Sequence, residues 1–247
     1  MADWNRRKPM DSLVAKEEGQ RLVPTLSWPH LLALGIGAIV GTGILTLIGV
    51  GVDRAGPAVL LSFAIAGAIC ACAALAYAEM ATLMPAAGSA YTYSYAVLGE
   101  LVAWVVGWCL ILEYSLVVST VAVGWSGYAT PLLTGIGFPA AFTASPALGG
   151  IINLPAIFII AVVALLLSIG TKESARLNTV LVVIKIATLS LFVFYTLPAF
   201  DSANLEPFMP FGFAKAMGPD GVERGVMAAA AIIFFAFYGF DAISTAA

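Results

Sequence analysis

Residues 31–50 constrain this chain most, because the segment LLALGIGAIVGTGILTLIGV is long and apolar enough to cross a bilayer. Four glycines fall within nine residues near its centre, at Gly35, Gly37, Gly41 and Gly43. A continuous helix in lipid needs no such cluster, whereas a helix that opens to present backbone N–H and C=O groups to a ligand does. We therefore expect a membrane helix that is interrupted near Gly41–Gly43.

The composition agrees with a membrane protein and excludes several other classes. Of the 247 residues, 61% are hydrophobic and 10% are charged, whereas soluble domains have roughly a quarter of their residues charged. The net charge of −3 gives no reason to expect a nucleic-acid partner. One histidine and three cysteines without metal-ligand spacing lead us to expect no metal and no cofactor.

Six apolar runs are long enough to span a bilayer, and they are too uniformly apolar for barrel strands, so we expect an all-α membrane protein. The runs cover residues 31–51, 58–84, 99–131, 152–170, 177–198 and 225–247. We expect Pro131 and Pro139 to end the third run, and residues 199–224 to form an ordered external loop with short helical pieces. The last run stops at Ala247 without a charged flank, which predicts an N-terminal portion of a longer protein.

The distribution of Lys and Arg predicts the orientation. Residues 1–23 are polar and are expected to be a cytoplasmic tail, followed by a transmembrane domain over 24–247. With the N-terminus inside, seven of the eleven basic residues lie on the cytoplasmic side, three lie outside and Lys185 lies within a span. This orientation favours a plasma or inner membrane.

Four ionisable residues lie within the predicted spans: Glu79, Glu113, Lys185 and Asp241. Each costs about 2.5–3.5 kcal/mol or more at the bilayer centre, so each is a candidate functional group. Glu79 and Asp241 stand near span ends, where a capping or gating role is an equal alternative. Lys185 is in mid-span, where its charge cannot easily reach the interface.

The glycine cluster has two interpretations that remain open. Gly37 and Gly41 form a GxxxG pattern, which permits close packing of helices. A discontinuous helix would instead begin its second half near Gly43 and offer free N–H groups to an anion such as a carboxylate. A dinucleotide site is excluded because Val40 stands where the GxGxxG pattern needs glycine.

The sixth span contains a second interruption, Tyr238-Gly239-Phe240-Asp241. With the N-terminus inside, spans one and six cross in opposite directions, and five spans separate their starts. This parity fits two inverted five-helix repeats, with the site between two interrupted helices.

The sequence resembles the amino acid–polyamine–organocation superfamily, specifically the N-terminal half of amino acid permeases of the cationic amino acid transporter type. The matching stretches are GIGAIVGTGI (35–44), YAEMATLMPAAGSAYTYSY (77–95), LGELVAWVVGWCLILEY (98–114), NTVLVVIKIATLSLF (178–192) and FFAFYGFDAIST (234–245). The resemblance implies a five-plus-five inverted-repeat fold of about twelve helices, here truncated to about six, with helices one and six unwound.

The resemblance also implies roles for particular residues. The backbone of Gly41, Thr42, Gly43 and Ile44 would bind the substrate carboxylate, and Phe235, Ala236 and Tyr238 would bind the amino group and side chain. Lys185 would carry the coupling proton near the first break, in place of a sodium ion. Glu113 would face the central cavity, with Glu79 and Asp241 as further cavity or gate residues.

These expectations favour secondary transport of amino acids coupled to protons. A sodium-independent exchanger of amino acids or polyamines is the alternative. A membrane enzyme is disfavoured because the ionisable residues are scattered over several spans. A structural scaffold would explain neither the glycine breaks nor Lys185.

Overall fold

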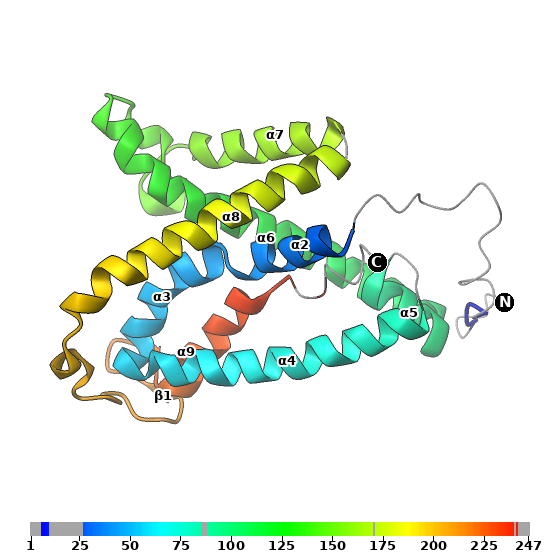
Figure 1. Cartoon of the computed structure of the whole chain (residues 1–247), viewed down its shortest axis with the longest axis horizontal. Coiled ribbons are helices and arrows are strands. Elements are labelled where there is room, and N and C mark those ends of the chain that lie inside the picture. The colour runs from blue at the N-terminus through cyan, green and yellow to red at the C-terminus, as the bar shows by residue number, and fades with distance from the viewer. Residues whose placement is uncertain (1–5, 10–26, 85–87, 170, 240, 242–247) are drawn as a thin grey trace. The chain divides into compact units, whose positions relative to one another are not determined.

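The computed structural model describes residues 6–9, 27–84, 88–169, 171–239 and 241 (Figure 1). The chain divides into two compact units. The first unit comprises Met1–Ser12 and Ala90–Ser174, and the second unit comprises Leu13–Ser89 and Ala175–Ala247. Most of the predicted tail over residues 1–23 lies outside the described residues.

The first predicted span consists of two helices in the second unit, α2 (Trp28–Ile39) and α3 (Thr42–Ala55). Pro29 stands in the first turn of α2, where its missing N–H would have no intrahelical acceptor in any case. The short 3-10 helix η1 (Gly56–Ala58) then leads into α4 (Val59–Leu83), which covers the second predicted span.

The second unit resumes at Ala175, within α8 (Thr171–Thr196). This helix covers most of the fifth predicted span. The sixth span starts as α9 (Val226–Ile233) and continues as the 3-10 helix η6 (Phe234–Phe237). Between α8 and α9 lie η4 (Leu197–Ala199), η5 (Ser202–Leu205) and an antiparallel pair of strands, β1 (Ala216–Met217) and β2 (Glu223–Arg224). The strands pair Ala216 with Arg224 and Met217 with Glu223.

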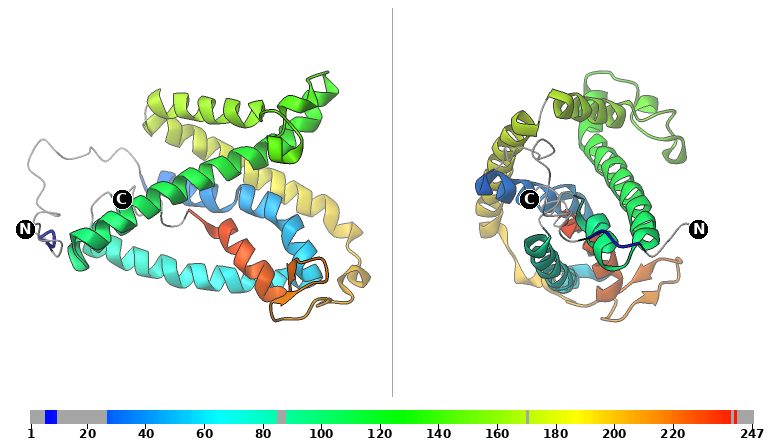
Figure 2. Two further views of the ribbon diagram at one scale, coloured as in Figure 1. Left: turned by 180° about the vertical axis from the view of Figure 1, so that it is seen from behind. Right: turned by 90° about the vertical axis from the view of Figure 1, so that its right-hand side faces the viewer.

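The core of the second unit lies where α9 packs between α3 and α4 (Figures 1 and 2). Small residues dominate this core, which allows the helices to approach closely. Its buried members are Ala55, Val59, Ala66, Ala229, Ile233 and Ala236. Ile233 and Ala229 are completely buried, so this part of the chain is well shielded from its surroundings.

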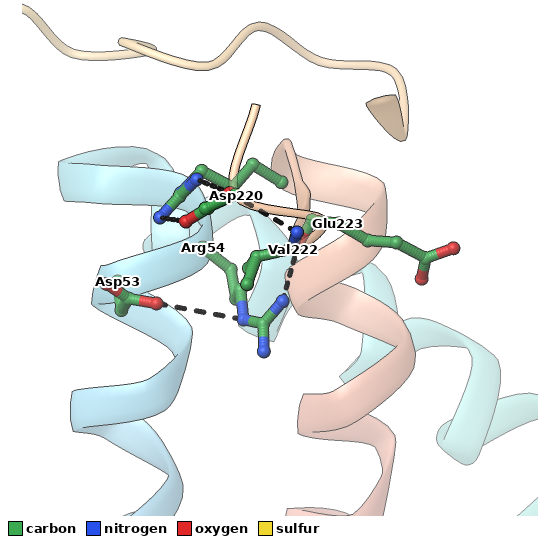
Figure 3. Close-up of polar contacts among 6 residues, drawn as sticks. Asp53, Arg54, Asp220, Val222 and Glu223 are labelled. Atoms are coloured by element: carbon green, nitrogen blue, oxygen red, sulfur yellow. Dashed lines mark hydrogen bonds and ion pairs between the residues drawn. The ribbon is translucent and has the colours of Figure 1, made fainter. Parts of the chain in front are cut away.

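The segment before α9 forms hydrogen bonds with the end of α3 and with the residue just before α4; Figure 3 shows the contacts at Arg54. The Arg54 guanidinium, at the end of α3, donates to the carbonyl of Glu223 at 2.9 Å, and the N–H of Gly225 donates to the carbonyl of Arg54 at 2.9 Å. At the start of α4, the N–H of Ala58 donates to the carbonyl of Phe208 at 2.9 Å. The loop is therefore ordered by backbone contacts, although it contains a strand pair that the sequence analysis did not predict.

An ion pair joins β2 to the turn between the two strands. Arg224 donates through both terminal nitrogens to the two carboxylate oxygens of Asp220, at 2.8 Å each. These hydrogen bonds lower the pKa of Asp220 below its ordinary value and raise the pKa of Arg224. The Arg224 guanidinium also lies over the Phe211 ring, 5.2 Å from its centroid.

The first unit contains three helices, α5 (Ser89–Val97), α6 (Glu100–Gly135) and α7 (Leu154–Ile169). Only the first residue of α5, Ser89, is assigned to the second unit. Between α6 and α7 lie the short 3-10 helices η2 (Ala140–Phe142) and η3 (Pro146–Leu148). Asn153 connects α6 and α7 through its side chain, because its Nδ2 donates to the Ser126 hydroxyl at 2.7 Å and its Oδ1 accepts from the N–H of Ala156 at 3.0 Å.

The prediction that Pro131 ends the third span is wrong, because α6 continues through it to Gly135. Threonine hydroxyls on either side of this proline donate to backbone carbonyls of the same helix, from Thr130 to Ser126 at 2.8 Å and from Thr134 to Thr130 at 2.9 Å. Membrane helices tolerate proline in their interior more readily than soluble helices do.

The described helices are long and apolar enough for a membrane in three places: Trp28–Leu83, Glu100–Gly135 and Ala175–Ala199. Two shorter apolar helices cover Leu154–Ile169 and Val226–Phe237. Many large apolar side chains on these helices are exposed, Leu75 and Leu132 among them at 72% and 75%. Such surfaces suit contact with lipid or with other membrane helices, so the chain is an integral, all-helical membrane protein.

Candidate functional site

The interruption of the first span lies at Val40 and Gly41. The N–H of Gly41 donates to the carbonyl of Ile39 at 3.0 Å, and α3 starts again with the bond from Leu45 N–H to the carbonyl of Gly41 at 3.2 Å. In a continuous helix the Gly41 N–H would instead bond to the carbonyl of Gly37. The break therefore leaves the Gly37 carbonyl available to another donor, and it starts a new helical N-terminus at Thr42.

The donor that reaches the Gly37 carbonyl, at the end of α2, is the side chain of Lys185 on α8. Its ammonium group donates to the carbonyl of Gly37 at 3.0 Å. It also lies 4.0 Å from where a Cβ on Gly41 would stand, so it sits beside the break itself. A cation at a helix C-terminus interacts favourably with the negative end of the helix dipole, and its N–H groups satisfy a terminal carbonyl.

The same faces of α2 and α8 continue in contact away from the break. The side-chain amide of Asn178 donates to the carbonyl of Ala33 at 3.3 Å. A Cβ on Gly37 would stand 2.9 Å from Asn178 Oδ1 and 3.0 Å from Val182 Cγ2. Gly37 thus packs closely against α8, as the GxxxG interpretation predicts, while Gly41 lies at the break.

The interruption of the sixth span lies against that of the first. After η6, the N–H of Tyr238 donates to the carbonyl of Phe235 at 3.2 Å, and Gly239 adopts φ +113°, a conformation that favours glycine. A Cβ on Gly43 would collide with the backbone of Ala236, and a Cβ on Gly239 would stand 2.5 Å from Ala38 Cβ. The two interrupted segments are therefore in direct contact.

Several of the predicted site residues are brought together at this place. Gly41, Gly43 and Ala236 lie at the junction of the two breaks, with Lys185 beside Gly41. Thr42 and Ile44 belong to the first turn of α3. Phe235 and Tyr238 flank Ala236, with rings 6.3 Å apart and nearly parallel.

The three acidic residues that were predicted to line a cavity or gate lie at different places in the structure. Asp241 is buried just beyond the second break. Glu79 is exposed on α4, four residues before that helix ends. Glu113 lies on α6, which belongs to the first unit. Their assignment as cavity or gate residues stays a prediction.

The sequence analysis missed Asn178. A signal for it was present, since Asn178 precedes Lys185 by seven residues and therefore shares one face of α8. Asparagine within an apolar run is also costly in lipid unless it finds a partner. The identity of that partner, a carbonyl within α2, depends on tertiary contacts that spacing alone does not give.

An all-helical membrane protein with two interrupted helices in contact at a glycine-rich junction has the features of transporters built around discontinuous helices. The sequence model of a family described as amino acid permease matches residues 26–247. The chain belongs to the amino acid permease family, within the amino acid–polyamine–organocation superfamily.

Three relatives illustrate the range within this family. The branched-chain amino acid permease BcaP of Bacillus subtilis (strain 168) is 46% identical over 98% of this chain and 51% of its own length. The methylthioribose transporter of the same strain is 44% identical over 100% of this chain and 52% of its own. The vacuolar cationic amino acid transporter 2 of Arabidopsis thaliana is 38% identical over 98% of this chain and 38% of its own. The chain spans about half the length of the first two relatives.

Proposed function

We propose that this chain forms the first half of a secondary transporter that moves amino acids across a membrane, coupled to protons through Lys185. The observation that carries the proposal is the bond from Lys185 to the Gly37 carbonyl, directly beside the break between α2 and α3. Relatives named as amino acid permeases and transporters support transport rather than enzyme catalysis.

The substrate carboxylate would bind to backbone N–H groups in the first turn of α3, at Thr42, Gly43 and Ile44. A helix N-terminus suits an anion because its first N–H groups have no intrahelical acceptor and its dipole is positive there. Phe235, Ala236 and Tyr238 would contact the amino group and side chain. The direct contact between Gly43 and Ala236 supports a single site that both interrupted helices form.

Proton coupling would act through the attachment of α2 to α8. When protonated, Lys185 holds the end of α2 through a charge-assisted hydrogen bond, which is about twice as strong as a neutral one. Loss of the proton would weaken this bond and release the end of α2 next to the substrate. Proton movement and substrate movement would then be linked at one place in the molecule.

The remaining expectations form part of the same proposal. Residues 24–247 would be a transmembrane domain behind a cytoplasmic N-terminal tail, in the plasma or inner membrane. The interrupted spans one and six would be equivalent helices of two inverted repeats. Glu79, Glu113 and Asp241 would line the cavity or its gates.

The alternative mode is sodium-independent exchange, and the bond from the Lys185 ammonium group to the Gly37 carbonyl is compatible with it. A lysine that keeps its proton would act as a fixed cation at the end of α2, replacing a sodium ion without carrying protons. Substrate outside would then accelerate efflux of substrate from inside, and a pH gradient alone would drive no uptake.

Uptake by the full-length protein in proteoliposomes tests the proposal and separates the two modes. The substrate panel contains branched-chain amino acids, cationic amino acids and methylthioribose, each with and without a pH gradient that is acidic outside. Gradient-driven accumulation of one amino acid class is the expected result. Exchange without accumulation would establish the second mode, and transport of methylthioribose alone would contradict an amino acid substrate.

A further inference from the structure

The contact between α2 and α8 contains a polar residue that the proposed coupling does not use, Asn178. Its amide donates to the carbonyl of Ala33 at 3.3 Å. Asn178 precedes Lys185 by seven residues, so the two side chains lie on one face of α8, about two turns apart. Their acceptors, Ala33 and Gly37, are one turn apart on α2.

The two hydrogen bonds differ in what they do for α2. The Gly37 carbonyl has lost its helical donor at the break, so Lys185 replaces a missing bond. The Ala33 carbonyl lies inside α2, where the helix itself provides the N–H of Gly37 as a donor. The bond from Asn178 therefore adds nothing that α2 needs for its own helix, and its effect is to attach α2 to α8.

The two bonds also differ in their response to protons. An asparagine amide keeps both N–H groups at any physiological pH, whereas a lysine can release its proton. The close approach of Gly37 to Asn178 Oδ1 and Val182 Cγ2 holds the same stretch of α2 on α8. This part of the contact is thus independent of the charge on Lys185.

We propose that Asn178 is a positioning residue that fixes the first part of α2 to α8, so that a change at Lys185 moves only the end of α2 beside the substrate. This inference rests on the proposed function, because it concerns the same binding site. It predicts that Asn178 affects substrate affinity through the placement of the break, without contacting the substrate.

Kinetics in proteoliposomes test this role with the full-length protein. Asn178→Leu removes the amide at nearly constant size, and Asn178→Gln keeps an amide donor. Thr179→Val is the matched control, because the Thr179 hydroxyl donates within α8, to the carbonyl of Ala175 at 2.9 Å. We expect Asn178→Leu to raise KM by about threefold to tenfold with little change in maximal rate, which is the loss expected for one interhelical hydrogen bond. Asn178→Gln is expected to recover most of the loss, and Thr179→Val to match the wild type.

Hydrogen exchange provides a second measurement that needs no substrate. We expect faster exchange of backbone amides over residues 36–41 in Asn178→Leu than in Thr179→Val. Unchanged KM and unchanged exchange in Asn178→Leu would overturn the inference, as would equal losses in Asn178→Leu and Thr179→Val. A wild type that transports none of the substrates would overturn the proposed function instead, and the exchange measurement would still decide the role of Asn178.

Discussion

The two helices of the first span are held in place by contrasting contacts. α3 packs with α4 and α9 through a buried core of small and branched apolar residues, in which Ile233 is completely buried. α2 is attached to α8 by hydrogen bonds from the side chains of Asn178 and Lys185 to backbone carbonyls. A well-packed core resists displacement, whereas a pair of hydrogen bonds can be exchanged at a cost of about 0.5–3 kcal/mol each.

Under the proposed function, this difference would give the two sides of the break separate tasks. The α3 side would provide a fixed N-terminus for a substrate anion, and its far end is held by the bond from Arg54 to Glu223 (Figure 3) and by the bond from Gly225 to Arg54. The α2 side would end at a lysine whose bond depends on its proton. In this proposal the stable recognition surface and the part that can be released would lie on either side of Gly41.

The largest effect is expected from Gly43→Ala in α3, the helix that packs against α4 and α9. The new methyl group would collide with the backbone of Ala236, which cannot move without displacing the sixth span. Overpacking of this kind costs about 1–3 kcal/mol or more, so we expect loss of uptake and lower thermal stability. Gly49→Ala is the control, because among the described residues no atom outside its own stretch of helix lies within 4 Å of its Cβ position. Similar activity of the two variants would contradict the contact between the breaks.

A smaller effect is expected from Gly37→Ala, the same substitution in α2, which hydrogen bonds attach to α8. Its methyl group would meet the ends of two side chains, Asn178 Oδ1 at 2.9 Å and Val182 Cγ2 at 3.0 Å. Side-chain ends can move, so we expect a stable protein with a severalfold higher KM. Combining it with Val182→Ala should restore part of the affinity, because this removes the contact with Val182 Cγ2 and leaves the one with Asn178 Oδ1. If Gly37→Ala destabilises the protein as strongly as Gly43→Ala, the contrast between the two sides is wrong.

The smallest effect is expected from Asp220→Asn in the strand pair, where the ion pair is exposed. Because the hydrogen bonds from Arg224 lower the pKa of Asp220 in the folded protein, its contribution to stability is present above the unfolded pKa of about 3.9. That contribution is lost as the pH falls through the lower, folded pKa. Thermal stability of wild type and variant should therefore differ slightly at neutral pH and converge in acid. A difference that grows in acid would contradict this sign.

Hydropathy and glycine placement were sufficient to predict apolar helices in these parts of the chain and the interruption of the first one. Lys185 stood out because a charge in mid-span is costly in lipid. One local feature was misjudged, since Pro131 lies inside α6. A proline is a helix breaker in most soluble helices but is tolerated within membrane helices, so its presence alone did not fix where the helix ends.

The contacts that build the site could not be predicted from spacing. Gly43 and Ala236 are far apart in the sequence, and their contact depends on how α9 packs on α3 and α4. The bond from Asn178 to Ala33 likewise depends on which face of α8 lies on α2. Sequence pattern identified residues with unusual chemistry, and tertiary packing determined which of them meet.

The most direct test of the account is uptake driven by a pH gradient in Lys185→Ala, compared with Lys215→Ala. Lys215 is an exposed lysine that pairs with Glu223 at 2.7 Å in the strand pair, far along the chain from the break. Lys215→Ala is expected to accumulate substrate like the wild type, whereas Lys185→Ala is expected not to respond to the gradient. Normal gradient-driven accumulation by Lys185→Ala would contradict the central claim that the proton acts at the end of α2.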